Sequence, residues 1–121
     1  MFLATIDRTK RLLLLNYVGN VTADELRNGL KEANALLADL PPGIRILADF
    51  GRMESMDADS PRELGRLMES ADRKGVEMVA RVIPDPTKDI GLNILAAFHY
   101  RKPLPTVTCA SMEEAAKELG I

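Results

Sequence analysis

Residues 44–67 read IRILADFGRMESMDADSPRELGRL, and this stretch decides the fold class. It opens with an apolar run at residues 44–50, whose length and composition are typical of a buried strand. It continues into Ser60-Pro61-Arg62-Glu63, where serine can cap a helix, proline suits the first helical position and glutamate lies three residues after the cap. The stretch therefore predicts a strand followed by a helix that begins at Ser60, the unit from which parallel α/β sheets are built.

The N-terminal residues predict an antiparallel hairpin. Apolar runs at residues 2–6 and 11–18 are separated by Asp7-Arg8-Thr9-Lys10, a polar segment of hairpin-turn length. The second run contains Leu12-Leu13-Leu14-Leu15, which is continuous and not alternating. A continuous apolar run of this length indicates a strand that is covered on both faces.

Capping residues mark the other helix starts. Thr22 followed by Glu25 forms a capping-box pattern, and Ser111 followed by Glu114 repeats it near the C-terminus. Thr87 is placed to cap a further helix. We also expect Gly75 to close the helix that begins at Ser60, because glycine readily adopts the left-handed conformation of a helix end.

Two more apolar runs, at residues 76–83 and 106–110, predict the last strands. The expected order is β-β-α-β-α-β-α-β-α. Helices and strands alternate from Thr22 onward, so right-handed crossovers predict a mixed, largely parallel sheet with packed helices. A chain of 121 residues is expected to form a single domain spanning 1–121.

The composition narrows the function classes. Sixteen basic and eighteen acidic residues give a net charge of −2, which lacks the basic excess that binding nucleic acid usually needs. No apolar run approaches the roughly eighteen residues of a membrane helix. The only cysteine, Cys109, lies in a predicted buried strand and has no disulfide partner. We expect a cytoplasmic protein without a membrane span.

The element order and several residues resemble the STAS domain family, which is typified by the anti-sigma-factor antagonist SpoIIAA. The strand Ile46-Leu47-Ala48-Asp49-Phe50-Gly51, the loop Met56-Asp57-Ala58-Asp59-Ser60 and the helix with Leu64, Gly65 and Leu67 look like that family's third strand, Asp-Ser-Ser-Gly loop and second helix. The chain is also similar to SpoIIAA-like relatives grouped with CRAL-TRIO lipid-binding domains. The resemblance implies the family's α/β fold and a regulatory role similar to that of anti-sigma-factor antagonists.

The loop departs from the family's motif at the residue that matters for switching. The resemblance places the family's phosphorylated serine at Ala58, which has no hydroxyl group to modify. Asp57 matches the motif's aspartate, and Asp59 and Ser60 replace its second serine and its glycine. We expect these four residues to form the partner-binding loop without the phosphorylation switch. A simpler interpretation is that Asp57, Asp59 and Ser60 only start the following helix.

No set of residues predicts catalysis, a cofactor or a metal site. The lone His99 has no nucleophile or metal ligand near it in the sequence, so a surface or interface role is expected. No glycine-rich segment joins a strand to a helix. A magnesium site at the carboxyl edge of the sheet is the enzymatic alternative, and its ligands would come from five aspartates. These are Asp49, Asp57, Asp59, Asp85 and Asp89.

The remaining candidate is an apolar surface rich in methionine. Met53, Met56, Met68, Phe98 and Tyr100 could gather near the second and third helices, where methionine adapts to varied shapes. Core filling is the simpler interpretation of the same residues.

Two functional hypotheses follow. The first is a non-enzymatic module that binds a regulatory protein through the loop and the helix after it. The alternative is a carrier or sensor of a small apolar, lipid-like ligand. A homodimer is a further expectation, because the edge strands of an open sheet need protection.

Overall fold

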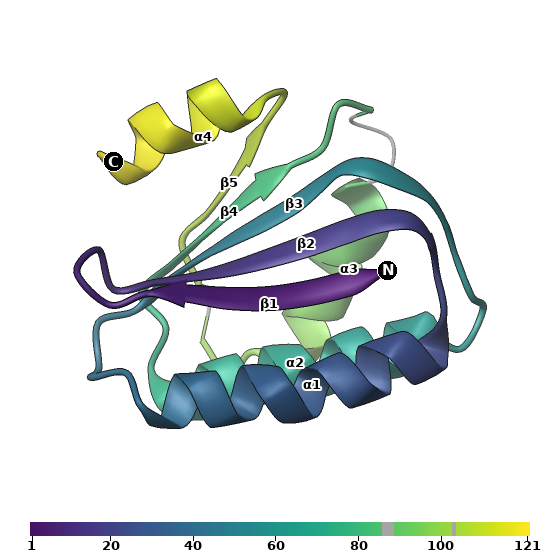
Figure 1. Cartoon of the computed structure of the whole chain (residues 1–121), viewed down its shortest axis with the longest axis horizontal. Coiled ribbons are helices and arrows are strands. Elements are labelled where there is room, and N and C mark those ends of the chain that lie inside the picture. The colour runs from purple at the N-terminus through teal and green to yellow at the C-terminus, as the bar shows by residue number, and fades with distance from the viewer. Residues whose placement is uncertain (86–88, 103) are drawn as a thin grey trace.

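The computed structural model describes residues 1–85, 89–102 and 104–121. Its element order is the predicted β-β-α-β-α-β-α-β-α (Figure 1). The elements are β1 (Phe2–Asp7), β2 (Leu12–Val21), α1 (Ala23–Ala38), β3 (Arg45–Met56), α2 (Ser60–Lys74), β4 (Met78–Val82), α3 (Asp89–His99), β5 (Thr106–Cys109) and α4 (Met112–Leu119).

The five strands form one mixed sheet in the order β1-β2-β3-β4-β5. β1 pairs antiparallel with β2, which confirms the predicted hairpin, and the other neighbours pair in parallel. Each parallel connection contains a helix, as the alternation of apolar runs and capping patterns predicts.

β3 is longer than the sequence predicts. The apolar run predicts a strand at residues 44–50, whereas β3 continues to Met56. In the structure residues 51–56 stay paired with β2, through Gly19 opposite Met53 and Val21 opposite Met56, with two shifts of register along the way. β4 stops pairing at Asp49, so the end of β3 extends beyond β4 as a two-stranded overhang with β2. We call this part, residues 51–56 of β3, the β3 extension.

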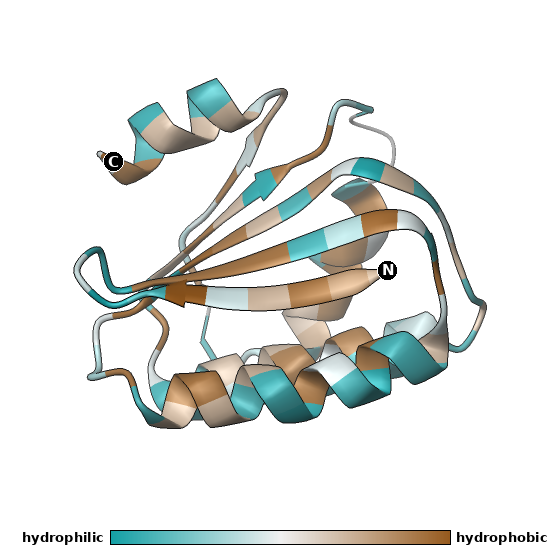
Figure 2. Ribbon diagram, in the orientation of Figure 1, coloured by the Kyte–Doolittle hydropathy of each residue, from teal (hydrophilic) through white to brown (hydrophobic). Residues whose placement is uncertain are grey.

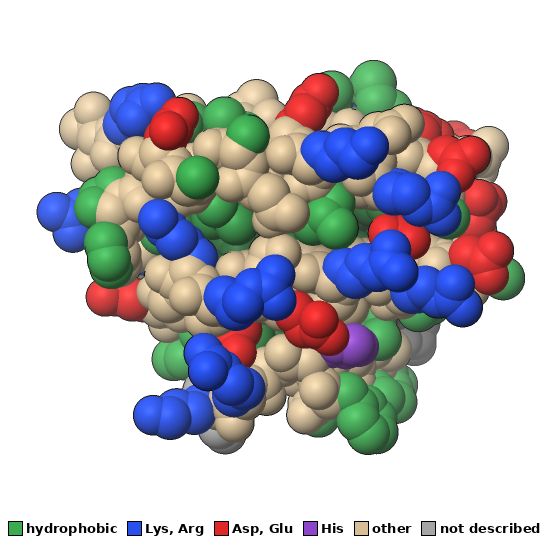
Figure 3. Space-filling model, turned by 90° about the horizontal axis from the view of Figure 1, so that it is seen from below, with side chains coloured by type: hydrophobic (Ala, Val, Ile, Leu, Met, Phe, Trp, Pro, Cys, Tyr) green, Lys and Arg blue, Asp and Glu red, His purple; other side chains and the backbone are tan. Residues whose placement is uncertain are grey.

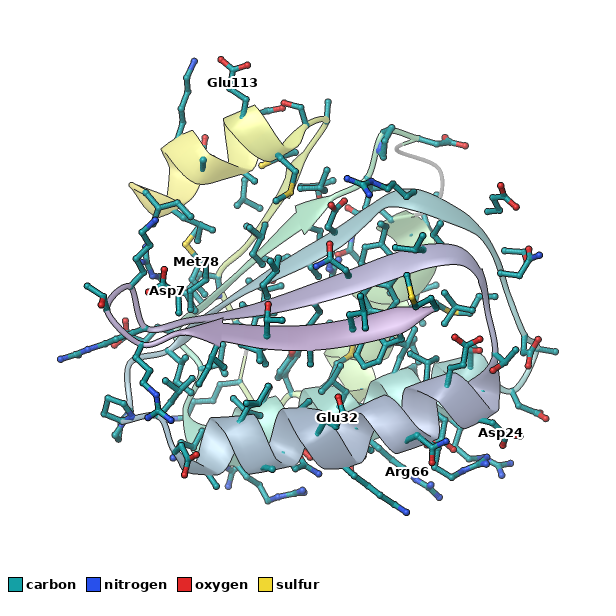
Figure 4. All side chains as sticks on the ribbon, in the orientation of Figure 1. Asp7, Asp24, Glu32, Arg66, Met78 and Glu113 are labelled. Carbon is teal, nitrogen blue, oxygen red and sulfur yellow. The ribbon has the colours of Figure 1, made fainter. Side chains whose placement is uncertain are left out.

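Helices α1, α2 and α3 cover one face of the sheet, and α4 covers part of the other (Figure 1). The leucine run divides between these layers: Leu13 and Leu15 belong to the larger core, and Leu12 to the smaller core beneath α4. Figure 2 shows the hydrophobic residues concentrated on the strands and on the helix sides that face them. In Figure 4, Arg66 and Glu113 project away from the sheet.

The predicted helix ends are confirmed where the structure describes them, with one exception. Thr22 and Glu25 form a complete capping box, and the Ser111 hydroxyl accepts a hydrogen bond from the Glu114 amide. Gly75 closes α2 with a left-handed φ of 81°. Thr87 lies outside the described residues.

The exception is Ser60, because its predicted role as the N-cap is wrong. The preceding residue, Asp59, already has helical φ and ψ of −85° and −6° and is itself the cap, without a side-chain bond. The Ser60 amide donates to the Asp57 carbonyl, so the chain turns one residue earlier than the sequence pattern suggests. Ser60 is consequently the first helical residue, fully buried, and its hydroxyl has no hydrogen-bond partner in the described part of the chain.

Two helical glycines mark places where elements approach closely. A Cβ on Gly29 of α1 would lie 2.1 Å from the Phe2 ring, and one on Gly65 of α2 would lie 2.4 Å from the His99 ring. α1 therefore packs against β1, and α2 against the end of α3, through positions that admit no side chain.

Gly29→Ala should destabilise the fold by about 1–3 kcal/mol, because the Phe2 ring must leave its place in the core. Urea unfolding followed by circular dichroism measures this difference. Gly91→Ala is the matched control, since it also replaces a helical glycine but its new Cβ meets nothing within 4 Å. The control should be stabilising by up to about 1 kcal/mol. Equal effects of the two variants would contradict the close approach of Phe2 to α1.

Ser60→Ala should leave stability unchanged or raise it by about 1 kcal/mol, because it removes a buried hydroxyl that lacks a partner. Ser111→Ala is the contrasting variant: it removes a true helix cap and should cost about 1 kcal/mol. The same unfolding measurement applies to both. If Ser60→Ala lost as much stability as Ser111→Ala, the conclusion that the Ser60 hydroxyl does not cap α2 would be contradicted.

Candidate functional site

Helix α3 directs large apolar side chains toward solvent. Ile90, Ile94 and Phe98 recur every four residues and are 62%, 55% and 81% exposed. We call these three residues the α3 ridge. No residue of α3 is buried, which is unusual for so apolar a helix. In Figure 3, hydrophobic side chains gather beside the single histidine, His99, which ends this helix.

An apolar groove of about 380 Å³ lies between the β3 extension, the start of α2 and the inner side of α3. Its floor and walls come from segments that the sequence separates widely, and they meet at the carboxyl ends of β3 and β4. The lining residues are Phe50, Met53, Met56, Pro61, Leu64, Ile83, Gly91, Leu92, Ile94 and Leu95. Because none of these side chains is charged or hydrogen-bonding, the groove suits an apolar occupant.

A second, smaller cavity of about 40 Å³ lies deeper, against the sheet. It shares Phe50, Leu64 and Leu92 with the groove, so the two spaces adjoin at these side chains. Unlike the groove, it also has polar walls, which come from Tyr17, Arg81 and Tyr100. We call it the inner cavity. An apolar groove beside a cavity lined by a cation and two hydroxyl groups can distinguish the two ends of a ligand that reaches both spaces.

Both tyrosines keep their protons at neutral pH. Burial raises the pKa of Tyr17 far above its usual value, with a smaller contribution from nearby Tyr100. Burial also raises the pKa of Tyr100 to about 12, against the opposing effect of Arg81. Tyr17 is further fixed by stacking on Phe50, with ring centroids 4.1 Å apart and planes 9° from parallel. Both hydroxyls can therefore donate hydrogen bonds at neutral pH, and stacking holds the Tyr17 ring in place.

Arg81 joins the inner cavity to the start of α3. It is 3% exposed and lies on β4, and its Nη1 donates to Asp89 at 3.0 Å and to Asn93 at 2.7 Å. Thr108 of β5 also donates to Asp89, at 2.7 Å. A buried arginine needs such partners, since an unpaired buried charge would be strongly destabilising.

The other end of α3 is also held by polar contacts. His99 Nδ1 lies 2.7 Å from a carboxylate oxygen of Glu69, and Arg101 donates to Asp72 at 2.7 Å. Both acidic partners belong to α2. Helix α3 is thus fixed at both ends, while its middle forms the wall of the groove.

The structure divides the predicted methionine-rich surface into three parts. Met53 and Met56 line the groove, whereas Met68 and Tyr100 line the inner cavity. Phe98 lies on the α3 ridge, pointing to solvent. Sequence reasoning missed Arg81, although one signal was present: a lone arginine within the apolar segment Val79-Ala80-Arg81-Val82.

The four residues of the predicted partner-binding loop do not share one environment. Asp57 accepts a hydrogen bond from the Ala23 amide at 3.0 Å, so its carboxylate joins the loop to the start of α1. Ala58 and Asp59 are exposed, and Ser60 is buried. Asp57 is exposed as well, so three of the four residues are presented at the surface and only Ser60 is not.

The enzymatic alternative gains no support from the described residues. Among residues 1–85, 89–102 and 104–121, no group of three histidine, cysteine or acidic side chains could hold a metal ion. The Asp49 carboxylate accepts a hydrogen bond from the Gly51 amide, and Asp57 and Asp89 have the partners given above.

In the described part of the chain, no helix is long and apolar enough to cross a membrane. Cys109 is buried in β5, as predicted.

Comparison with known proteins gives structural matches only. The sequence matches no protein-family model and no curated protein. An uncharacterised protein of the DUF3478 family from Shewanella loihica, described as having a SpoIIAA-like fold, superposes with a TM-score of 0.74 at 15% identity, covering 98% of this chain and 92% of that one.

Two anti-sigma-factor antagonists are also similar in structure. Unphosphorylated SpoIIAA gives a TM-score of 0.62 at 18% identity, over 99% of this chain and 98% of that one. The antagonist from Mycobacterium paratuberculosis gives 0.61 at 14% identity, over 100% and 94%. The likeness spans nearly the whole of every chain, and it agrees with the observed strand order and helix placement. This protein therefore has the SpoIIAA-like α/β fold of STAS domains.

Proposed function

We propose that this protein is a non-enzymatic binding module whose groove takes a small apolar ligand. The groove itself carries the proposal. Its volume of about 380 Å³ is in the range of small-molecule sites, and its ten lining residues are all apolar or glycine. It also lies at the carboxyl ends of parallel strands, where open α/β sheets commonly bind ligands.

A regulatory role is consistent with this proposal. The fold is shared with proteins described as anti-sigma-factor antagonists, and the position expected for phosphorylation carries Ala58. Ligand binding would then replace phosphorylation as the signal. Because Ile94 belongs both to the groove and to the α3 ridge, an occupant would contact the same helix that faces solvent.

The α3 ridge favours a second candidate, the binding of a regulatory protein partner. Ile90, Ile94 and Phe98 form a continuous apolar stripe on a helix with no buried residue. Exposed apolar stripes of this kind are typical of protein-binding surfaces. The two candidates share Ile94, but Gly91 lines only the groove and Phe98 lies only on the ridge, so substitutions at these two positions can separate them.

Gly91→Phe should weaken binding of Nile red, an uncharged apolar fluorophore, by roughly tenfold or more, as measured by fluorescence titration. Gly91 lines the groove, and a Cβ there meets no atom within 4 Å, so a side chain can start from this position without a clash and add bulk at the groove. Ile90→Phe is the matched control, because it adds a ring on the ridge next to the groove but outside its lining.

The proposal predicts saturable Nile red binding that Gly91→Phe weakens and Ile90→Phe preserves. Absence of saturable binding, or equal effects of the two variants, would refute the groove as a ligand site. Phe98→Glu separates the second candidate: it should leave Nile red binding intact while weakening capture of a regulatory protein through the ridge.

A further inference from the structure

We propose that the ligand of the groove is an apolar carboxylic acid, whose carboxylate binds in the inner cavity to Arg81, Tyr17 and Tyr100. This inference rests on the proposed function, because it assigns the head group of the ligand whose tail occupies the groove. It commits the site to one chemical class, an alkyl acid such as a fatty acid.

The first argument is the unused bonding capacity of Arg81. A guanidinium group has five N–H donors, and the two contacts described above both use Nη1. Neither Nε nor Nη2 has an acceptor among the described residues, although the side chain lies in the interior and lines the inner cavity. An arginine in this state can bind a planar carboxylate with two parallel hydrogen bonds.

The second argument concerns charge. Asp89 already pairs with Arg81, so a ligand carboxylate would be a second anion nearby. Asp89, however, has other sources of stabilisation: Thr108 donates to it, and it begins α3, where the helix dipole favours a negative charge. Arg81 can therefore share its charge between Asp89 and a ligand.

The third argument is the placement of the two tyrosines. Tyr17, Tyr100 and Arg81 all line the inner cavity, so their polar groups face the same small space. Both hydroxyls remain protonated at neutral pH and can donate to an anion. Two hydroxyl donors and one guanidinium match the acceptor capacity of a carboxylate, which has two oxygens and no donor when ionised.

The size of the cavity selects the head group. About 40 Å³ exceeds the roughly 10–15 Å³ that one ordered water requires, so the space admits a small polar group. The tail would leave the cavity past Leu92, a half-buried residue that lines both spaces, and continue along the methionines of the groove.

Isothermal titration calorimetry with decanoic acid and decanol tests the assignment, because the two probes share a tail and differ in the head group. Decanoic acid should bind the intact protein about tenfold more tightly than decanol, since hydrogen bonds to charged groups are stronger than neutral ones. Equal affinities would overturn the carboxylate site while leaving the groove in place. Binding of neither probe would overturn the groove and, with it, the proposed function.

Two substitutions at the same ion pair should change the acid preference in opposite directions. Arg81→Met removes the guanidinium and should bring the acid-to-alcohol affinity ratio close to one. Asp89→Asn leaves the guanidinium without its competing carboxylate and should raise the ratio. Both variants remove the ion pair between β4 and α3, so an effect of that loss on the helix would move the two ratios alike, and that result would overturn the assignment. Tighter binding of decyl phosphate than of decanoic acid would also overturn it.

Discussion

The buried contact between Arg81 and the start of α3 is the interaction on which the groove depends. Helix α3 has no fully buried residue, and its apolar contact with the core comes from half-buried residues such as Leu92 and Leu95. Arg81 connects β4 in the sheet to Asp89 and Asn93 in the helix, at 3.0 and 2.7 Å. Glu69 and Asp72 of α2 hold the far end through His99 and Arg101. Polar contacts hold both ends of α3, and the apolar side chains in its middle form one wall of the groove.

The order of elements could be predicted because its signals are local. The capping pattern of Thr22 and Glu25 and the glycine at 75 act within a few residues of where they stand, and the structure confirms them. The β3 extension could not be predicted, because its polar residues are held as a strand by backbone pairing with β2 across the sheet. Ser60 misled for a related reason: whether a serine caps a helix depends on the backbone angles of its neighbour, which a pattern of residue types does not contain.

The candidate site could be predicted only in part. The sequence located an apolar surface near the second and third helices, and Met53 and Met56 do line the groove. It could not separate these residues from Met68, which lies in the inner cavity, or from Phe98, which faces solvent. Arg81 was overlooked because a charged residue within an apolar strand acquires meaning only from its partners, and those come from later elements. The role of Arg81 and the separation of the methionines depend on contacts between distant segments, which local sequence patterns do not contain.

The shortness of β4 leaves one edge of β3 unpaired by that strand. Since β4 stops opposite Asp49, the β3 extension has a free backbone edge on the side of the groove. A free edge of this kind is a template on which a strand of another molecule can add. Here the pairing with β2 shifts register twice, and Arg52 and Glu54 place opposite charges along the extension. Irregular pairing and charge both disfavour the addition of a further strand at such an edge.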